Sequence, residues 1–374
     1  MLDFLIVRPV EMKDLDQVYT LALHTANGLS TLPKDKRLIQ EKISQSLASF
    51  SKQIKQVSDE LYFFVLEDTQ AKRIVGTASI LASVGVNDAF YSYKIVQKQN
   101  LLKQVYHELH LDKQWNGPSE LGTLYVLPEY RKKGVGRFLS LSRFIFIAIH
   151  KKRFKDEIIS ELRGASDSEG SSPFWKHVMK HFFDMPFAEA DLQTQRDKSF
   201  IEEGLPTSPL ILETLPKQAQ EVIGQTHDYT VGAKRILEDE GLSLSNHVDI
   251  FDAGPKLSAK RDDLKVFSRL KIVPKYSLTE SLSNAVMHIV ASGRLSDFRA
   301  CCTSMTVAED KSCVIMHSPA LAACTDRESS LVRLPLYVPK SMKDYFSKGN
   351  NFLQNFSFIY RLFSLGVSSL KEKL

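Results

Sequence analysis

The apolar residues of the first 185 positions follow two periods, which predict strands and helices in alternation. Runs rich in β-branched and aromatic residues predict strands, and apolar residues that recur every three or four positions predict helices. The predicted elements are, in order, a strand, a helix, an antiparallel hairpin, a strand, a helix, a strand and a helix, at residues 4–7, 15–23, 60–85, 120–127, 137–150, 157–164 and 172–183. This order indicates a mixed α/β fold.

The stretch GLPTSP at residues 204–209 has the composition of a linker and predicts a domain boundary near residue 205. Beyond it the pattern predicts helices at 216–225 and 233–242 and a strand at 246–255. The last segment has aromatic and aliphatic residues at helical spacing, which predicts an amphipathic C-terminal extension. We therefore expect three parts, at residues 1–204, 205–340 and 341–374.

One loop, YRKKGVG at residues 130–136, combines positive charge with a nearly bare backbone and leads into the predicted helix 137–150. Glycines let a ligand approach backbone N–H groups closely, and a helix N-terminus attracts anions. The sequence lacks the GK[ST] of a Walker loop, and a leucine stands where a dinucleotide fingerprint has its third glycine. The loop therefore predicts an anion site of another kind.

The composition is that of a globular protein with a sizeable core, since 43% of the 374 residues are hydrophobic and 25% are charged. A net charge of +5 is too small for a nucleic-acid coat, so we expect no nucleic-acid partner. Four cysteines lie within residues 301–324 without metal-site spacing and predict free thiols in a reducing compartment. No apolar run is long enough for a signal peptide or a membrane span, so we expect a cytoplasmic protein without an integral membrane segment.

Five stretches between residues 28 and 257 resemble one family when they are read together: GLSTLP, SELGTLYVLPEYRKKGVGRFLSLSRF, ELRGASDSEGSSPFWKHVMKHFF, VIGQTHDYTVGAKRILEDEGL and DIFDAGPKL. They resemble the arginine N-succinyltransferase family, also called arginine/ornithine succinyltransferase, within the GCN5-related N-acetyltransferase-like acyl-CoA transferases. The resemblance fades from about residue 265 to 330, and Gly122 stands where family members carry cysteine.

The resemblance implies a mixed, mainly antiparallel sheet flanked by helices, with a second related half that completes the active site. It implies transfer of a succinyl group from succinyl-CoA to the α-amino group of L-arginine in arginine catabolism, with succinyl-CoA as co-substrate and no permanently bound cofactor. It also implies a homo-oligomer or a heteromer with a related subunit. Two alternatives stay open: another acyl-CoA-dependent N-acyltransferase acting on ornithine or another amine, and a non-catalytic acyl-CoA-binding subunit.

The family pattern also assigns roles to residues of this chain. His227, in GQTHDYT, matches the catalytic histidine that serves as proton donor, and a histidine suits this task because its pKa lies near neutrality. Leu124 matches a residue that contacts succinyl-CoA, and we expect it to act through its backbone. The expected CoA-binding residues are Leu124, Arg131, Lys132, Gly134, Val135 and Gly136.

Acidic residues are the candidates for holding a cationic substrate. Glu120 is a possible base or cation-binding group, although an exposed acid at a strand edge fits equally well. Asp249 and Asp252, in DIFDAGP, are suited to a guanidinium, although an Asp before Ala-Gly-Pro is more often a turn residue.

Two pairs of residues after the strand predicted at 157–164 carry weaker signals. Phe174 and Trp175 are suited to a cleft, but aromatic residues at helical spacing are usually core residues. His177 and His181 lie one helical turn apart without a third ligand nearby, so we predict no metal.

Overall fold

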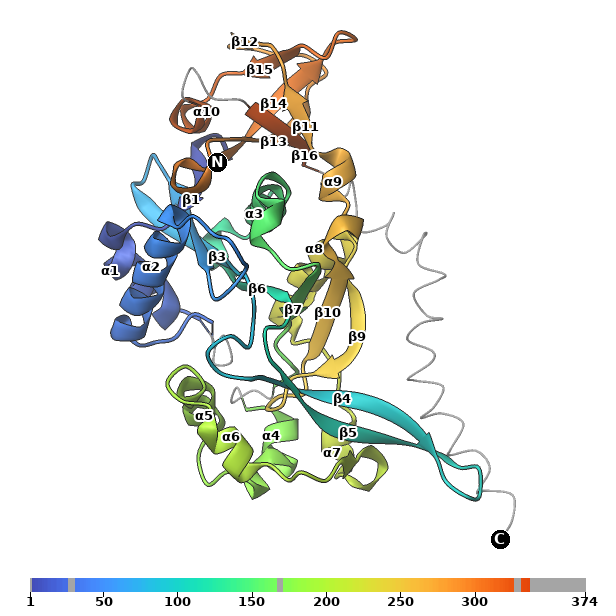
Figure 1. Ribbon diagram of the computed structural model, residues 1–374. Coiled ribbons are helices and arrows are strands. Elements are labelled where there is room, and N and C mark those ends of the chain that lie inside the picture. Colours follow the sequence, from blue (N-terminus) through green and yellow to red (C-terminus); the bar gives the residue numbers. More distant parts are fainter. Residues whose placement is uncertain (1, 26–30, 167–170, 326–330, 337–374) are drawn as a thin grey trace. The chain divides into compact units, whose positions relative to one another are not determined.

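The computed structural model describes residues 2–25, 31–166, 171–325 and 331–336. Residues 1–336 form one compact unit (Figure 1). The predicted extension at 341–374 lies outside the described residues. The boundary near residue 205 and the relatedness of the two halves stay predictions.

The described strands form one large, mainly antiparallel sheet of sixteen strands. Their order across the main path is β11-β16-β13-β14-β1-β2-β3-β6-β7-β10-β9-β4-β5-β8, with β15 beside β14 and β12 beside β15. The strands are β1 (Leu5–Pro9), β2 (Leu61–Asp68), β3 (Arg73–Leu81), β4 (Phe90–Gln99), β5 (Val105–Gln114), β6 (Ser119–Val126), β7 (Glu157–Glu161), β8 (Leu210–Ile211), β9 (Ser243–Val248), β10 (Pro255–Lys260), β11 (Lys271–Val273), β12 (Tyr276–Thr279), β13 (Val286–Ser292), β14 (Arg299–Val307), β15 (Cys313–Met316) and β16 (Leu331–Pro335).

The α-helices flank this sheet, with α1 and α2 on one side of β1–β3 and α3 on the other (Figure 1). Their bounds are α1 (Leu15–Leu23), α2 (Lys36–Ser51), α3 (Val135–Ile149), α4 (Pro173–His177), α5 (Phe187–Gln193), α6 (Ser199–Gly204), α7 (Lys217–Gln220), α8 (Val231–Glu240), α9 (Val266–Arg269) and α10 (Pro319–Cys324). The mixed, mainly antiparallel sheet flanked by helices confirms the predicted fold class.

The predicted elements of the first half are present at the predicted places. β2 and β3 form the expected antiparallel hairpin, with Leu61 opposite Leu81. The helix predicted at 172–183 is shorter, because the α-helix stops at His177 and a 3-10 turn follows. Its predicted N-cap is confirmed, since the Ser172 hydroxyl accepts from the N–H groups of Phe174 and Trp175.

The strand predicted at 246–255 is wrong in its second part. β9 ends at Val248, and β10 begins at Pro255 as a separate strand. The chain turns between them because the Asp249 carboxylate accepts from two backbone N–H groups, those of Phe251 and Asp252. An Asx-type turn of this kind ends a strand regardless of the apolar residues within it.

The main core lies between α3 and the sheet. An aromatic cluster joins three elements there: Phe146 of α3 lies with its ring centre 5.1 Å from that of Phe64 in β2 and 5.7 Å from that of Phe50 in α2. Nearly the whole length of α3 is buried, so its position relative to β6 is fixed by packing on several sides. Phe174 and Trp175 belong to a second buried cluster, as predicted for core residues.

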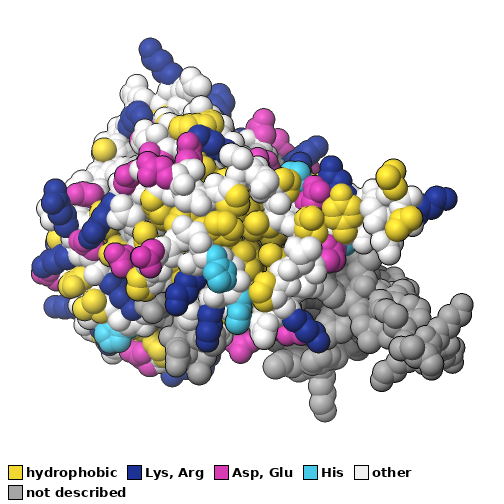
Figure 2. All heavy atoms as spheres, turned by 90° about the horizontal axis from the view of Figure 1, so that it is seen from below, with side chains coloured by type: hydrophobic (Ala, Val, Ile, Leu, Met, Phe, Trp, Pro, Cys, Tyr) yellow, Lys and Arg dark blue, Asp and Glu magenta, His cyan; other side chains and the backbone are white. Residues whose placement is uncertain are grey.

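β4 and β5 form a long hairpin arm that extends from the sheet (Figure 1). Its turn exposes two leucines, Leu101 and Leu102. Figure 2 shows hydrophobic side chains in the middle of the face seen there and again on the arm, with charged side chains between and around them.

The described residues include no helix that is long and apolar enough to cross a membrane. The same residues hold no group of three or more His, Cys, Asp or Glu side chains arranged for a metal ion, and His177 and His181 belong to none. All four cysteines are buried and carry free thiols, as the sequence predicts.

Candidate active site

The glycine loop between β6 and α3 turns sharply and leaves the first turn of the helix bare. Lys133 and Gly134 both adopt the left-handed conformation, with φ of 52° and 82°, and Gly134 immediately precedes α3. Apart from the adjoining residues of its own helix, a Cβ atom added at Gly136 would meet no atom of the described residues within 4 Å. The first N–H groups of a helix have no partner inside the helix, so the open space beside them is suited to an anion.

The two predicted basic residues of this loop are placed differently. The Nε atom of Arg131 donates to the Val126 carbonyl at 2.7 Å, and its guanidinium carbon lies 5.3 Å from the centre of the Tyr125 ring. Lys132 is exposed. Arg131 therefore holds the loop against β6, whereas Lys132 is available to an anion from solvent. Val135 is buried and its backbone N–H donates to the Lys132 carbonyl at 3.2 Å, so its side chain is not available to a ligand.

β6 and β7 pair over only a short stretch, and the part beyond it, where the two strands no longer pair, is called the gap. The strands run parallel, and within the described residues their pairing is confined to Ser119–Ile158 and Glu120–Ile159. Leu124 lies beyond the last of these pairs, on the part of β6 that leads to the glycine loop. An unpaired strand edge presents backbone N–H and C=O groups, so an extended ligand can bind along β6 here.

A bulge in β6 changes the direction of the backbone just before Leu124. Thr123 has a positive φ of 57°, and the register between β3 and β6 shifts between Thr77 and Ser79. The bulge is held by Thr31, whose hydroxyl accepts from the Thr123 N–H at 3.1 Å. Bulges of this kind re-aim the backbone groups that follow them.

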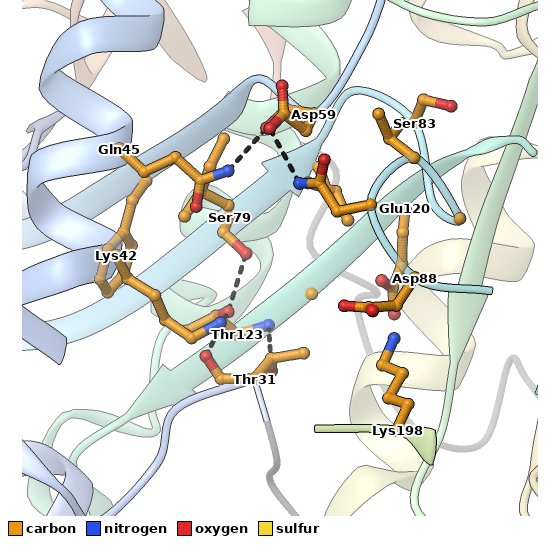
Figure 3. Close-up of a pocket in the computed structure, with 17 residues that line it drawn as sticks. Thr31, Lys42, Gln45, Asp59, Ser79, Ser83, Asp88, Glu120, Thr123 and Lys198 are labelled. Atoms are coloured by element: carbon orange, nitrogen blue, oxygen red, sulfur yellow. Dashed lines mark hydrogen bonds between the residues drawn. The ribbon is translucent and has the colours of Figure 1, made fainter. Parts of the chain in front are cut away.

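A cavity of about 210 Å³ lies beside the bulge, among α2, β2, β3 and β6 (Figure 3). Its lining brings together the carboxylates of Asp59, Asp88 and Glu120 and the ammonium groups of Lys42 and Lys198. Figure 3 shows the side chains of Lys198 and Asp88 pointing toward one another. Charges of both signs around one small space suit a substrate that itself carries both signs.

Glu120 is the predicted substrate residue that the structure places in this cavity. Burial raises the pKa of its carboxyl group, and the positive charges of Lys198, Lys256 and Lys42 act in the opposite direction. Burial likewise lowers the pKa of Lys42. Both shifts have one physical cause, because a poorly solvated site disfavours the charged form of each group until an opposite charge arrives.

A buried ion pair lies next to Glu120 on the neighbouring strands. The Lys256 ammonium is 3.7 Å from the Glu161 carboxylate and donates to the Ser92 hydroxyl at 3.1 Å. Burial raises the pKa of Glu161 to about 8, while Lys256 lowers it. Carboxyl groups whose pKa is raised by burial cluster at functional sites.

His227 lies on the β7 side of the gap and does not line the cavity. Its backbone N–H donates to the carbonyl of Arg163, just past the end of β7, and its Nδ1 atom accepts from the Tyr229 N–H at 3.1 Å. The ring is half-buried. Burial and the charge of Arg163 lower the pKa of His227, so the ring is neutral at pH 7. With Nδ1 occupied as an acceptor, the proton of the neutral ring lies on Nε2.

Asp252 is engaged by the protein itself. Its two carboxylate oxygens accept from the N–H groups of Gly164 and Gly254, at 2.8 and 2.7 Å. Burial raises its pKa well above the usual range. The adjacent Asp249 caps the turn described above. These contacts favour the turn role that the sequence left open for both residues.

Sequence reasoning missed several charged residues of this region: Lys42, Asp88, Glu161, Lys198 and Lys256. They come from α2, from the loop after β3, from β7, from the residue before α6 and from β10. No local pattern marks them, because each is one polar residue in an ordinary segment. Only Glu161 carried a signal, as an acid at the end of an apolar strand.

The mainly antiparallel sheet, the gap between two parallel strands and the glycine loop at a buried helix define a mixed α/β protein of the predicted fold class. Within this class the chain belongs to the arginine N-succinyltransferase family. The family model described as arginine N-succinyltransferase beta subunit matches residues 5–266.

Individual relatives agree with this assignment. The arginine N-succinyltransferase of Yersinia enterocolitica is 38% identical over 79% of this chain and 87% of its own length. That of Photorhabdus laumondii is 34% identical over 90% of this chain and 99% of its own. The solved structure of arginine/ornithine succinyltransferase subunit AI from Pseudomonas aeruginosa has a TM-score of 0.80 at 32% identity and covers 90% of this chain and 99% of that one.

Proposed function

We propose that this protein transfers the succinyl group of succinyl-CoA to the α-amino group of L-arginine, giving N2-succinyl-L-arginine and CoA. The observation that carries the proposal is a continuous set of features along β6. A bare helix N-terminus lies at one end of this strand, an unpaired strand edge follows, and a cavity with charges of both signs lies at the other end. This order matches a long anionic thioester that meets a zwitterionic amine.

In this proposal the pyrophosphate of CoA binds the N–H groups at the start of α3, near Gly134 and Gly136, and the exposed Lys132 adds positive charge. The pantetheine lies along β6 in the gap. The thioester carbonyl then reaches the bulge, where the backbone N–H of Leu124 stabilises the oxyanion that forms on attack.

The amine attacks as its neutral form and makes a tetrahedral intermediate. The C–S bond then breaks, and the Nε2–H of His227 donates a hydrogen bond to the departing sulfur. The surplus proton of the new amide nitrogen passes through water to the thiolate, which becomes the thiol of CoA.

Arginine lies in the cavity, with Glu120 facing a cationic group and the ammonium groups of Lys42 and Lys198 facing its carboxylate. Bidentate pairing makes a carboxylate the preferred partner of a guanidinium. Assembly with further copies or with a related subunit stays a prediction, in line with the family description as a beta subunit.

The activity is tested by following thiol release from succinyl-CoA and from acetyl-CoA, with L-arginine and with ornithine. Thiol release with succinyl-CoA and arginine, and formation of N2-succinylarginine by mass spectrometry, is the expected result. Release with another acyl-CoA or amine alone would assign a different N-acyltransferase. Acyl-CoA binding without release would assign a non-catalytic subunit.

The substitution Glu120→Gln keeps the size of the side chain and removes its charge. We expect KM for arginine to rise at least about tenfold, the usual loss for a close charge pair, while binding of CoA is unchanged. Steady-state kinetics and calorimetry measure the two effects. Glu157→Gln on β7 is the matched control, since Glu157 is exposed and should leave both values at the parental level. A parental KM in Glu120→Gln would remove this residue from the arginine site.

A further inference from the structure

Arg143 is a buried cation whose hydrogen-bond partners among the described residues are all neutral. It lies on α3, and only 2% of its surface is exposed. Its Nη1 atom donates to the Gly122 carbonyl at 3.1 Å, and its Nη2 atom donates to the Ser140 hydroxyl at 2.9 Å. Its Nε atom is buried and has no hydrogen-bond partner among the described residues.

Two other buried arginines form ion pairs within the protein. Arg137, six residues earlier on α3, donates to the Asp239 carboxylate at 2.6 Å. Arg8 donates to both Asp14 and Glu67. A buried charge is costly unless an opposite charge accompanies it. Both of these guanidinium groups have an acidic partner inside the protein, whereas Arg143 donates to a carbonyl and a hydroxyl.

Arg143 remains a cation at neutral pH despite its surroundings. Burial lowers its pKa to about 9, and burial is the one cause of that shift. A group with this pKa is almost fully protonated at pH 7. The uncompensated charge is therefore present in the protein before any ligand binds, and an anion that reached it would gain a desolvated partner.

The position of Arg143 determines which anion can reach it. The Gly122 carbonyl, its hydrogen-bond acceptor, belongs to the bulged part of β6, and Gly122 itself lines the cavity. The proposed thioester site at Leu124 is two residues further along the same strand. A succinyl group carries its free carboxylate two methylene groups beyond the thioester carbonyl, a length that would let the carboxylate lie near the bulge.

We propose that Arg143 is the residue that selects the acyl chain, by pairing with the free carboxylate of the succinyl group. The inference rests on the proposed function. When an acetyl group occupies the same place, the buried charge of the guanidinium stays unpaired, as it is in the protein without ligand. The site therefore distinguishes a dicarboxylic acyl-CoA from a monocarboxylic one through a single charge pair.

The test compares succinyl-CoA with acetyl-CoA in the parent and in Arg143→Met, whose side chain fills a similar space without charge. Calorimetry without amine gives both dissociation constants, and thiol release with arginine gives both values of kcat/KM. We expect the preference for succinyl-CoA to fall at least tenfold in Arg143→Met, with acetyl-CoA affinity within about twofold of the parent. Arg143→Lys should retain part of the preference, since it keeps the charge.

Thermal unfolding separates this role from a structural one. Replacing an unpaired buried charge by an apolar side chain should keep or raise the melting temperature, whereas Arg137→Met should lower it because Asp239 loses its partner. A folded Arg143→Met that keeps the parental preference would overturn the proposal. A raised KM for arginine with unchanged acyl preference would overturn it too, because the guanidinium would then face the amino-acid carboxylate. Absence of succinyl transfer in the parent would instead contradict the proposed function.

Discussion

Gly136→Val should abolish CoA binding while the protein stays folded. A Cβ at this position meets no described atom outside its own helix turn within 4 Å, so the valine side chain occupies the open space over the first turn of α3. That space is where the proposed site holds the pyrophosphate, and a branched side chain keeps phosphate oxygens from the backbone N–H groups. We expect at least about 100-fold weaker binding, a loss of about 2.8 kcal/mol or more. Isothermal titration with CoA measures it.

The choice of Gly136 over Gly134 matters for this experiment. Gly134 has a φ of 82°, which a valine adopts only with strain, so Gly134→Val combines loss of the ligand with damage to the loop. Lys132→Ala is the matched control, because Lys132 is exposed and its loss removes one charge without closing the site. Its binding should weaken only a few-fold. Parental CoA affinity in Gly136→Val would refute the assignment of this loop.

The parts of the site that could be predicted from sequence are those built from one continuous segment. β6, the glycine loop and α3 follow one another along the chain, and α3 is buried on nearly all sides. Its unusually long apolar run was therefore visible without knowledge of its neighbours. Glycines next to a helix start likewise indicate an anion site through local geometry alone.

α2 was not predicted, because most of its residues are polar. A narrow stripe that includes Ile39, Ile43 and Phe50 enters the core, too few apolar residues for the pattern to stand out. A local signal was present in Asp35, whose carboxylate accepts from two N–H groups at the start of the helix. An aspartate before a helix-forming segment is a typical N-cap.

The charge constellation around Glu120 could not be predicted, since it depends on tertiary structure. Lys42 and Lys198 are separated by 156 positions in the sequence, and they line one cavity only because the folded chain brings α2 and the segment before α6 to it. The role of Arg143 could not be predicted for another reason. The sequence shows a basic residue within an apolar helix, but only the tertiary structure shows that no acidic residue pairs with it among the described residues.

His227→Ala should lower kcat by about 10² to 10⁴ with CoA affinity close to the parental value, the usual range for a positioned proton or hydrogen-bond donor. Pre-steady-state thiol release gives the rate of the chemical step, and calorimetry gives the affinity. His227→Asn supplies a second variant. Its side-chain oxygen can still accept the hydrogen bond that the Tyr229 N–H donates to Nδ1 in the parent. His181→Ala is the control, as His181 is exposed and should leave kcat unchanged.

The pH profile shows which task His227 performs. Its pKa is lowered from the ordinary value of 6.5, so the ring is neutral above that pH, and the parental rate should not decline through this group until the pH falls below 6.5. If the ring served as the base for the amine, raising the pH would supply free amine without it and partly rescue His227→Ala. The Nε2 proton, fixed by the Tyr229 contact, points instead to a donor for the departing sulfur, and we expect no rescue up to pH 9. Parental turnover in His227→Ala from pH 6 to 9 would exclude the histidine and leave Glu120 as the next candidate.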